Sequence, residues 1–163
     1  MALREIDDVM DEFRLRRARG DESDAVAALH QVSREHAMPF MRGLHTVEED
    51  RAFFRDRVFR ECQVWVAERN GDIIGMCAFR PGWLDHLYVH PAHQRGGVGS
   101  ALLRKAIDEN EALQLWVFQT NEKAIRFYER HGFTLARVTD GLENEERQPD
   151  ALYVYDVSRI VGR

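Results

Sequence analysis

The residues best suited to chemistry lie in HPAHQRGGVGSALLRKAI, residues 90–107, where glycines follow a glutamine and an arginine. A strand that ends in a glycine loop and opens a helix directs free backbone N–H groups at one point, where the positive end of the helix dipole adds to them. Gly96, Gly97 and Gly99 leave no Cβ in the way of a ligand and permit positive φ. The spacing predicts a phosphate site, to which Arg95 adds a charge.

Two familiar phosphate motifs do not fit these residues. The nucleoside-triphosphate loop needs a lysine followed by Ser or Thr after its last glycine, and Val98-Gly99-Ser100 supplies none. The dinucleotide fingerprint places its glycines after the first strand of a parallel unit, whereas these follow strands that look antiparallel. Because glycines alone are a weak signal, a strand-to-helix turn without a ligand is the structural alternative.

A second segment, NEKAIRFYERHGF at residues 121–133, supports a site. Asn121, Ala124 and Tyr128 are spaced three and four apart, so they share one face of a helix. That face carries a polar cap, a small residue and a phenol. The structural alternative for Tyr128 is a core aromatic residue with its hydroxyl at the edge.

The elements that must position these residues follow from periodicity and turn signals. Thr46 and Glu49 form a capping box for one helix, and NGD at residues 70–72 predicts an antiparallel hairpin. Strands are expected at 13–18, 62–68, 73–80, 83–91, 113–119, 132–140 and 151–157, and helices at 25–36, 47–59, 100–109 and 121–130. This order predicts an α/β or α+β fold built on one mixed sheet.

Length and composition restrict the class of protein. With 163 residues and 44% hydrophobic content we expect one domain over 13–163, preceded by an N-terminal extension over 1–12. A net charge of -5 disfavours a nucleic-acid partner. No apolar run suggests a signal peptide or a membrane partner, so we expect a cytoplasmic protein. Cys62 and Cys77 match neither a redox pair nor a zinc knuckle and are expected to be buried thiols.

Together, residues 87–103 and 121–133 resemble the two cofactor segments of the GCN5-related N-acetyltransferases (GNAT), an acyl-CoA-dependent family. The loop of that family reads Gln or Arg, two residues, Gly, one residue, then Gly or Ala, which Gln94, Gly97 and Gly99 satisfy. Family members often carry Gly then Arg or Lys where this chain has Arg95 then Gly96. The resemblance implies a mostly antiparallel sheet flanked by helices, with a bulge in the fourth strand and a splayed opening between the fourth and fifth strands.

The resemblance also implies a set of cofactor contacts, with acetyl-CoA as the co-substrate and no metal. The diphosphate of CoA is expected on backbone N–H groups of the loop, and pantetheine is expected to pair with the fourth strand, whose N–H at Leu87 or Tyr88 polarises the acyl carbonyl. Tyr128 is expected to share its proton with the leaving thiolate. The expected cofactor-binding residues are Leu87, Tyr88, Val89, Gln94, Arg95, Gly96, Gly97, Val98, Gly99, Ser100, Asn121, Ala124 and Tyr128.

The general base does not carry over from the family. Where members place a glutamate early in the fourth strand, this chain has Trp83, which accepts no proton. We predict Asp85 as the base, with His86, Glu145 and Glu146 as alternatives and an exposed strand carboxylate as the structural alternative for Asp85.

The acceptor wall is expected to include Trp83, Glu145 and Glu146, since carboxylates favour a cationic amine. His86, His90 and His93 are close in sequence, but they span a strand end and a loop, so solvated histidines are expected instead of a metal site.

These observations predict transfer of an acetyl group from acetyl-CoA to a primary amine. Because no cysteine is well placed as a nucleophile, the amine is expected to attack directly. The acceptor is expected to be a small molecule or a peptide, and the apolar last strands allow a homodimer. The alternative is a non-catalytic module that binds CoA or acyl-CoA and acts as a regulator.

Overall fold

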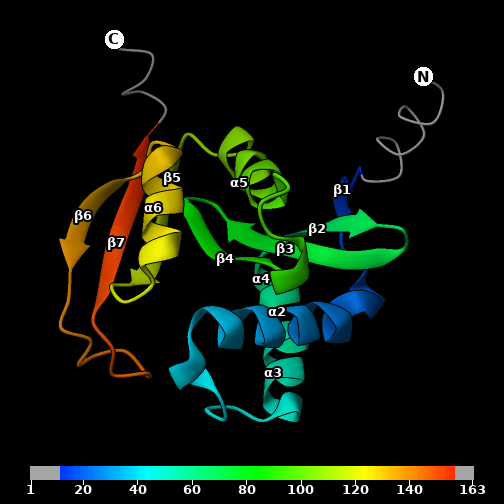
Figure 1. Ribbon diagram of the computed structural model, residues 1–163, viewed down its shortest axis with the longest axis horizontal. Helices are drawn as coiled ribbons and strands as arrows, with labels where there is room; N and C mark the ends of the chain where they lie inside the picture. The colour runs from blue at the N-terminus through cyan, green and yellow to red at the C-terminus, as the bar shows by residue number, and fades with distance from the viewer. Residues whose placement is uncertain (1–11, 157–163) are drawn as a thin grey trace.

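A computed structural model describes residues 12–156 and shows a seven-stranded sheet of order β1-β2-β3-β4-β5-β7-β6 (Figure 1). Apart from Glu12, the predicted extension over 1–12 lies outside the described residues. The strands are β1 Arg14–Arg17, β2 Gln63–Arg69, β3 Asp72–Arg80, β4 Trp83–Val89, β5 Ala112–Phe118, β6 Thr134–Val138 and β7 Asp150–Asp156. Every neighbouring pair is antiparallel except β4 and β5, which confirms the mixed, mostly antiparallel sheet.

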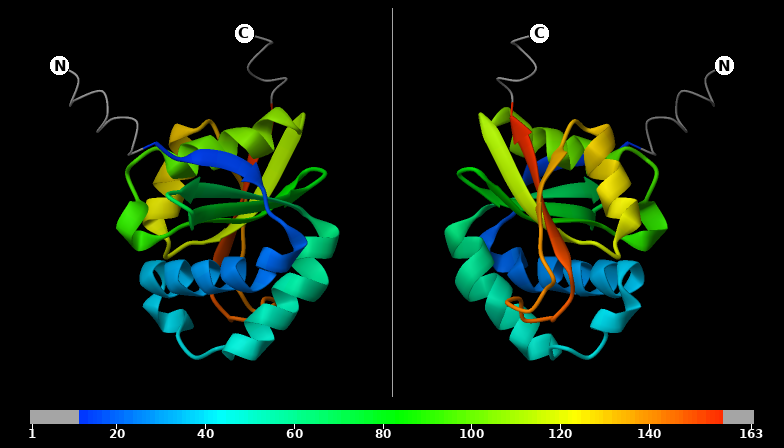
Figure 2. Two further views of the ribbon diagram at one scale, coloured as in Figure 1. Left: turned by 90° about the vertical axis from the view of Figure 1, so that its right-hand side faces the viewer. Right: turned by 90° about the vertical axis from the view of Figure 1, so that its left-hand side faces the viewer.

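Helices cover both faces of the sheet (Figure 2). On one face lie α2 Ser23–Ala37 and α3 Val47–Phe53, and on the other lie α5 Val98–Asp108 and α6 Glu122–Arg130. The short helical turns are η1 Gly20–Glu22, η2 Pro39–Met41, the π turn η3 Phe54–Val58, α4 Phe59–Glu61 and η4 Pro91–His93. Within residues 12–156, no helix has the length and apolar character needed to cross a membrane.

The helix that contains α3 begins as predicted and ends later. Its capping box is formed, because Glu49 N–H donates to Thr46 Oγ1 at 3.1 Å and Thr46 N–H donates to Glu49 Oε1 at 3.2 Å. The π turn then extends the helical path to Glu61, whereas the sequence predicted an end near residue 59. The capping box thus fixes the start of the helical segment that packs, with α2, on one face of the sheet.

The core is divided by the sheet into two parts. Phe79, Leu102 and Phe133 belong to the part beneath α5 and α6, and Val26 and Phe54 belong to the part beneath α2 and α3. Burying such a side chain stabilises the fold by about 1.5–3 kcal/mol. Cys77 is fully buried as expected, but Cys62, which follows α4 just before β2, is only half-buried.

The sheet opens between β4 and β5, as the resemblance implied. Ala78 pairs with His86 and Phe79 pairs with Leu84, so Asp85 is the extra residue of a bulge in β4. Only Trp83 and Gln114 pair across β4 and β5. Beyond that point the two strands diverge, and the β4 edge that faces β5 is left free of a neighbouring strand.

Candidate active site

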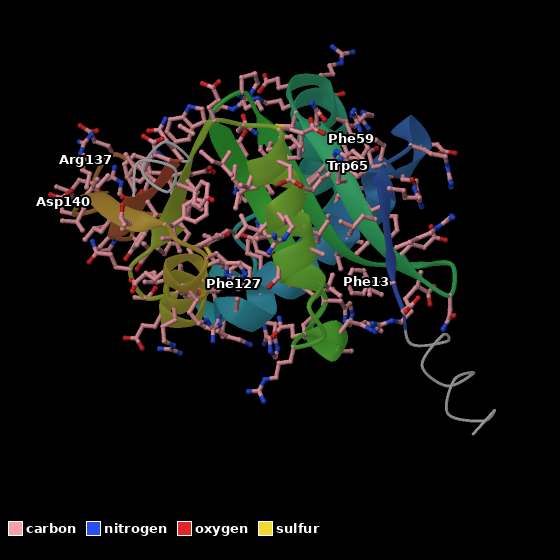
Figure 3. All side chains as sticks on the ribbon, turned by 90° about the horizontal axis from the view of Figure 1, so that it is seen from above. Phe13, Phe59, Trp65, Phe127, Arg137 and Asp140 are labelled. Carbon is pink, nitrogen blue, oxygen red and sulfur yellow. The ribbon has the colours of Figure 1, made fainter. Side chains whose placement is uncertain are left out.

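A cavity of about 1100 Å³ lies in the opening between β4 and β5. Its walls come from both strands, from α6, from the end of α2 and from the loop between β6 and β7, at the side of the molecule where Figure 3 labels Arg137 and Asp140. The predicted site residues that line it are Asp85, Leu87, Tyr88, Asn121, Ala124, Tyr128 and Glu146. The opening therefore gathers residues that are up to 61 positions apart in sequence.

The glycine loop contains two residues with a positive φ, one expected and one not. Of Gly96, Gly97 and Gly99, only Gly97 has a positive φ, at 82°, and it is the N-cap of α5. Arg95 also lies in the left-handed region, at 70°, which is uncommon for a residue with a Cβ. Alternation of left-handed residues with others turns successive N–H groups toward one side. The loop thus has the backbone of an anion site at the start of an 11-residue helix.

The two segments singled out in the sequence lie side by side. Lys123 Nζ donates to Gln94 Oε1 at 2.7 Å, and His131 Nε2 lies 3.0 Å from Ser100 Oγ. Figure 3 shows Phe127 between α6 and α5, where a Cβ on Gly99 would be 3.5 Å from its ring. The glycine loop at the start of α5 therefore adjoins the α6 face that carries Tyr128.

Tyr128 lies on the α6 side of the cavity and is 8% exposed. Burial raises the pKa of its phenol above the ordinary value of 10, so the hydroxyl holds its proton at neutral pH. Asn121 Oδ1 accepts from Ala124 N–H at 3.3 Å, which caps α6 and fixes its first turn at the cavity wall. The phenol is thus available as a hydrogen-bond donor.

Asp85 lines the cavity, but its carboxylate is engaged elsewhere. Arg80 Nε and Nη2 donate to it at 2.8 and 3.3 Å, and Cys62 Sγ lies 3.4 Å from Oδ2. The pair with Arg80 turns this carboxylate toward the guanidinium, and the role of Asp85 as the base stays a prediction. Burial, followed by the charge of Asp85, raises the pKa of Cys62 to about 12, and burial raises that of Cys77 to about 12. Both thiols therefore stay protonated.

His86 is packed against other rings, contrary to the expectation of a solvated histidine. Its ring lies 5.5 Å from Phe54, 6.0 Å from Phe53 and 5.2 Å from His30, and it lines the cavity. Burial lowers its pKa to about 4, so the imidazole is neutral at pH 7. Sequence reasoning did not single out His30, although its place after Leu29 on the apolar face of α2 was a signal.

The other two histidines contact each other, with ring centroids 5.7 Å apart, and each also has a further partner. His90 Nδ1 accepts from Ala92 N–H at 3.1 Å, and His93 Nδ1 lies 3.1 Å from Arg69 Nη1. Over residues 12–156, no three His, Cys, Asp or Glu side chains are grouped so that they could hold a metal ion.

The three residues predicted for the acceptor wall have different surroundings. Glu146 is half-buried and lines the cavity. Glu145 faces His45 instead, with 3.3 Å between its Oε1 and Nε2 of the imidazole. Trp83 does not line the cavity, because it stands where β4 still pairs with β5, and its ring carries the Arg80 guanidinium at 5.3 Å. Only Glu146 of the three is placed to contact an occupant of the cavity.

We expect Gly141→Ala to disturb the loop that carries Glu146. Gly141 has φ +80°, and a Cβ there would overlap the backbone carbonyl of Gln148. The left-handed conformation costs a residue with a Cβ about 1–2 kcal/mol, and the overlap adds to it. In urea unfolding, the free energy of unfolding should fall by about 2 kcal/mol more in this variant than in Gly71→Ala. Limited proteolysis should also cut it faster within residues 139–150.

Gly71→Ala is the matched control, because Gly71 has φ +85° with no atom within 4 Å of the added Cβ. Equal losses in the two variants would show that the overlap at Gly141 is relieved without cost.

Comparison with known sequences agrees with this geometry. The family profile described as acetyltransferase (GNAT) domain matches residues 60–135. The peptidyl-lysine N-acetyltransferase YiaC of Escherichia coli strain K12 is 30% identical over 120 residues, which cover 73% of this chain and 82% of that protein.

Comparison with solved structures shows the same fold. The apo form of YjaB from Escherichia coli superposes with a TM-score of 0.74 at 23% identity, covering 88% of this chain and 97% of the other. The putative acetyltransferase yncA from Salmonella typhimurium, solved with its cofactor acetyl-CoA, gives a TM-score of 0.66 at 19% identity and covers 90% of this chain and 94% of the other.

Proposed function

Because the chain belongs to the GCN5-related N-acetyltransferase family, we propose that it transfers an acetyl group from acetyl-CoA to a primary amine by direct attack. The observation that carries this proposal is the cavity between β4 and β5, which places the buried phenol of Tyr128 opposite a strand edge free of a neighbour. A CoA-binding module would need the glycine loop but not such a cavity beside it.

In this proposal, acetyl-CoA binds along one continuous path from the glycine loop to the cavity. Its diphosphate contacts the backbone N–H groups of 95–100 at the start of α5, where Arg69, Arg95 and Lys123 supply positive charge. Its pantetheine arm lies on the free edge of β4 at Leu87–Val89, between that strand and Asn121. This path leads the thioester to the cavity.

The reaction follows from the groups at the end of that path. The ammonium group of the acceptor first loses one proton to solvent. Its nitrogen lone pair then forms a bond to the thioester carbon, and an N–H of Leu87 or Tyr88 stabilises the oxyanion. When the C–S bond breaks, sulfur takes the electron pair and Tyr128 donates a hydrogen bond, and then its proton, to the thiolate. Since both cysteines keep their protons, an acyl-cysteine intermediate is not favoured.

The acceptor is a cationic amine, supplied by a small molecule or a peptide. The carboxylates of Asp140, Glu143 and Glu146 line the cavity against the single guanidinium of Arg137 among the described residues, so the wall attracts an ammonium group. The relative named a peptidyl-lysine N-acetyltransferase makes a lysine side chain the first acceptor to test.

Calorimetry and a free-thiol assay test this function together. We expect acetyl-CoA to bind the full chain, and thiol release to depend on an amine from a panel that contains lysine peptides, polyamines and amino acids. Gly97→Val should abolish binding, since φ of 82° excludes a β-branched residue. Binding without turnover for every amine would favour the regulatory module, and a folded sample with no binding heat would refute both.

A further inference from the structure

A buried polar cluster lies beneath the cavity, between α2 and the first turn of α3. It consists of His30, Ser33, Arg34 and Asp50, each between 3% and 6% exposed. Ser33 and Arg34 follow His30 on α2 by three and four residues, so both lie on the same helix face as His30. Arg34 Nη2 and Asp50 Oδ2 are 3.6 Å apart, which joins the two helices by an ion pair.

Each member of the cluster has a polar atom with no hydrogen-bond partner among residues 12–156. These atoms are His30 Nδ1, Ser33 Oγ, Arg34 Nε and Asp50 Oδ2. Buried polar groups in native proteins are normally hydrogen-bonded, and an ordered water bonded to about three of them is the usual solution. The cluster therefore has polar atoms of the kind that an ordered water satisfies.

The cluster reaches the cavity through one imidazole. The His30 ring lies 5.2 Å from that of His86 and 4.7 Å from that of Tyr88, both nearly perpendicular to it. His86 and Tyr88 line the cavity, whereas His30 is 5% exposed and lies behind them. Within the described part of the chain, the His86 ring makes ring contacts and no hydrogen bond.

The competing proton acceptors are mostly occupied. The carboxylates that line the cavity are Asp85, Asp140, Glu143, Glu146 and Asp150. Asp85 is held by Arg80, Asp140 accepts from Leu142 N–H at 3.0 Å, and Asp150 bonds Thr139 and Asn144. The two that are left, Glu143 and Glu146, belong to the loop between β6 and β7. His86 instead adjoins Leu87 on β4, the strand expected to hold the thioester.

Resting on the proposed acetyl transfer, we propose that His86 accepts the proton that the acceptor amine loses during attack and releases it to solvent in the cavity, while His30, packed edge-on behind it, positions its ring. The N–H bond breaks as the C–N bond forms, and the proton takes a lone pair of the imidazole. Sulfur gains its proton from Tyr128, and solvent restores both groups.

The charged and titratable groups around the His86 ring fit this role. His30 and Arg34 on α2 and Asp85 on β4 act on the ring directly. One step further out, Asp50 on α3 pairs with Arg34, Tyr88 on β4 contacts His30, and Glu146 on the β6–β7 loop acts on Tyr88. The carboxylate of Asp50 offsets the positive charge of Arg34, which otherwise opposes a protonated imidazole. Because burial keeps His86 neutral, its lone pair is free at working pH.

Turnover of His86 variants tests this proposal. We expect His86→Gln to bind acetyl-CoA with unchanged Kd in calorimetry but to lose about 10²-fold in kcat, within the range for general bases. Added imidazole should partly restore His86→Ala, in proportion to its unprotonated fraction. His30→Gln should change the pH dependence of kcat while leaving Kd for acetyl-CoA unchanged.

Glu146→Gln is the control, since it removes the other free base of the cavity and should raise KM for the amine more than it lowers kcat. Full turnover in His86→Gln, or an equal loss of kcat in Glu146→Gln, would overturn the role of His86. Rescue of His86→Ala by pyrrole, a ring of the same size without a basic nitrogen, would also overturn it. Lack of transfer by the unaltered chain refutes the proposed function itself.

Discussion

Tyr128→Phe is expected to lower kcat by about 10² to 10⁴-fold while the Kd of acetyl-CoA changes less than about twofold. The phenol is 8% exposed, and phenylalanine keeps the ring in its contacts with Phe127 and Phe133. Only the hydroxyl is removed, so the leaving thiolate loses its proton donor while the cofactor site keeps its shape. Single-turnover kinetics with saturating acetyl-CoA, beside calorimetry on the same samples, separates the two effects.

Tyr88→Phe provides the matched control for this variant. Its phenol also lines the cavity, and burial also raises its pKa, but it lies on β4 against His30 instead of on α6. We expect it to keep kcat within about tenfold of the unaltered chain. Wild-type turnover in Tyr128→Phe at saturation would remove this phenol from the mechanism.

The elements were predictable where local chemistry alone determines the backbone. The hairpin at Asn70 and Gly71 formed as expected, since both residues adopt the positive φ that a tight turn between two strands requires. Thr46 capped its helix and Asn121 capped α6. In each case the signal and the structure that it specifies lie within four residues of each other, so no tertiary contact was needed to interpret them.

The parts that could not be predicted depend on contacts between distant segments. The place of β7 between β5 and β6 follows from no local pattern. Pairing of Asp85 with Arg80 decides where that carboxylate points, and the packing of α2 brings His30 to His86 across 56 positions. The glycine loop was predicted to direct its backbone N–H groups at one point, but the sequence did not reveal that Arg95 takes a left-handed conformation.

The site and the stability of the fold are linked through these histidines. A neutral imidazole enclosed by Phe53, Phe54 and His30 is stable only while it stays unprotonated, and the same enclosure leaves its lone pair free at the cavity. An acidic medium should therefore disable transfer and weaken the fold over one pH range.

The free energy of unfolding is accordingly expected to fall by about 3 kcal/mol as the pH is lowered from 6.5 to 4, through His86 alone. Burial lowers its pKa from 6.5 to about 4, so in this range the unfolded chain binds a proton that the folded chain excludes. Stability thus rises with pH through the window and is fully present above 6.5. The pKa of His30 is also lowered by burial, which acts in the same direction.

Urea unfolding at a series of pH values measures this dependence. The diagnostic quantity is the slope of the free energy of unfolding against pH, because the substitution itself also changes stability at every pH. His86→Gln should flatten the slope between pH 6.5 and about 4.5, above the range in which carboxylates such as Glu22, with its pKa lowered to about 2, begin to contribute. His36→Gln, which changes an exposed ring on α2, should leave the slope as it is. If His86→Gln kept the full slope, burial would not be lowering the pKa of His86 in the folded chain, and the ring enclosure that keeps its imidazole neutral would not hold in solution.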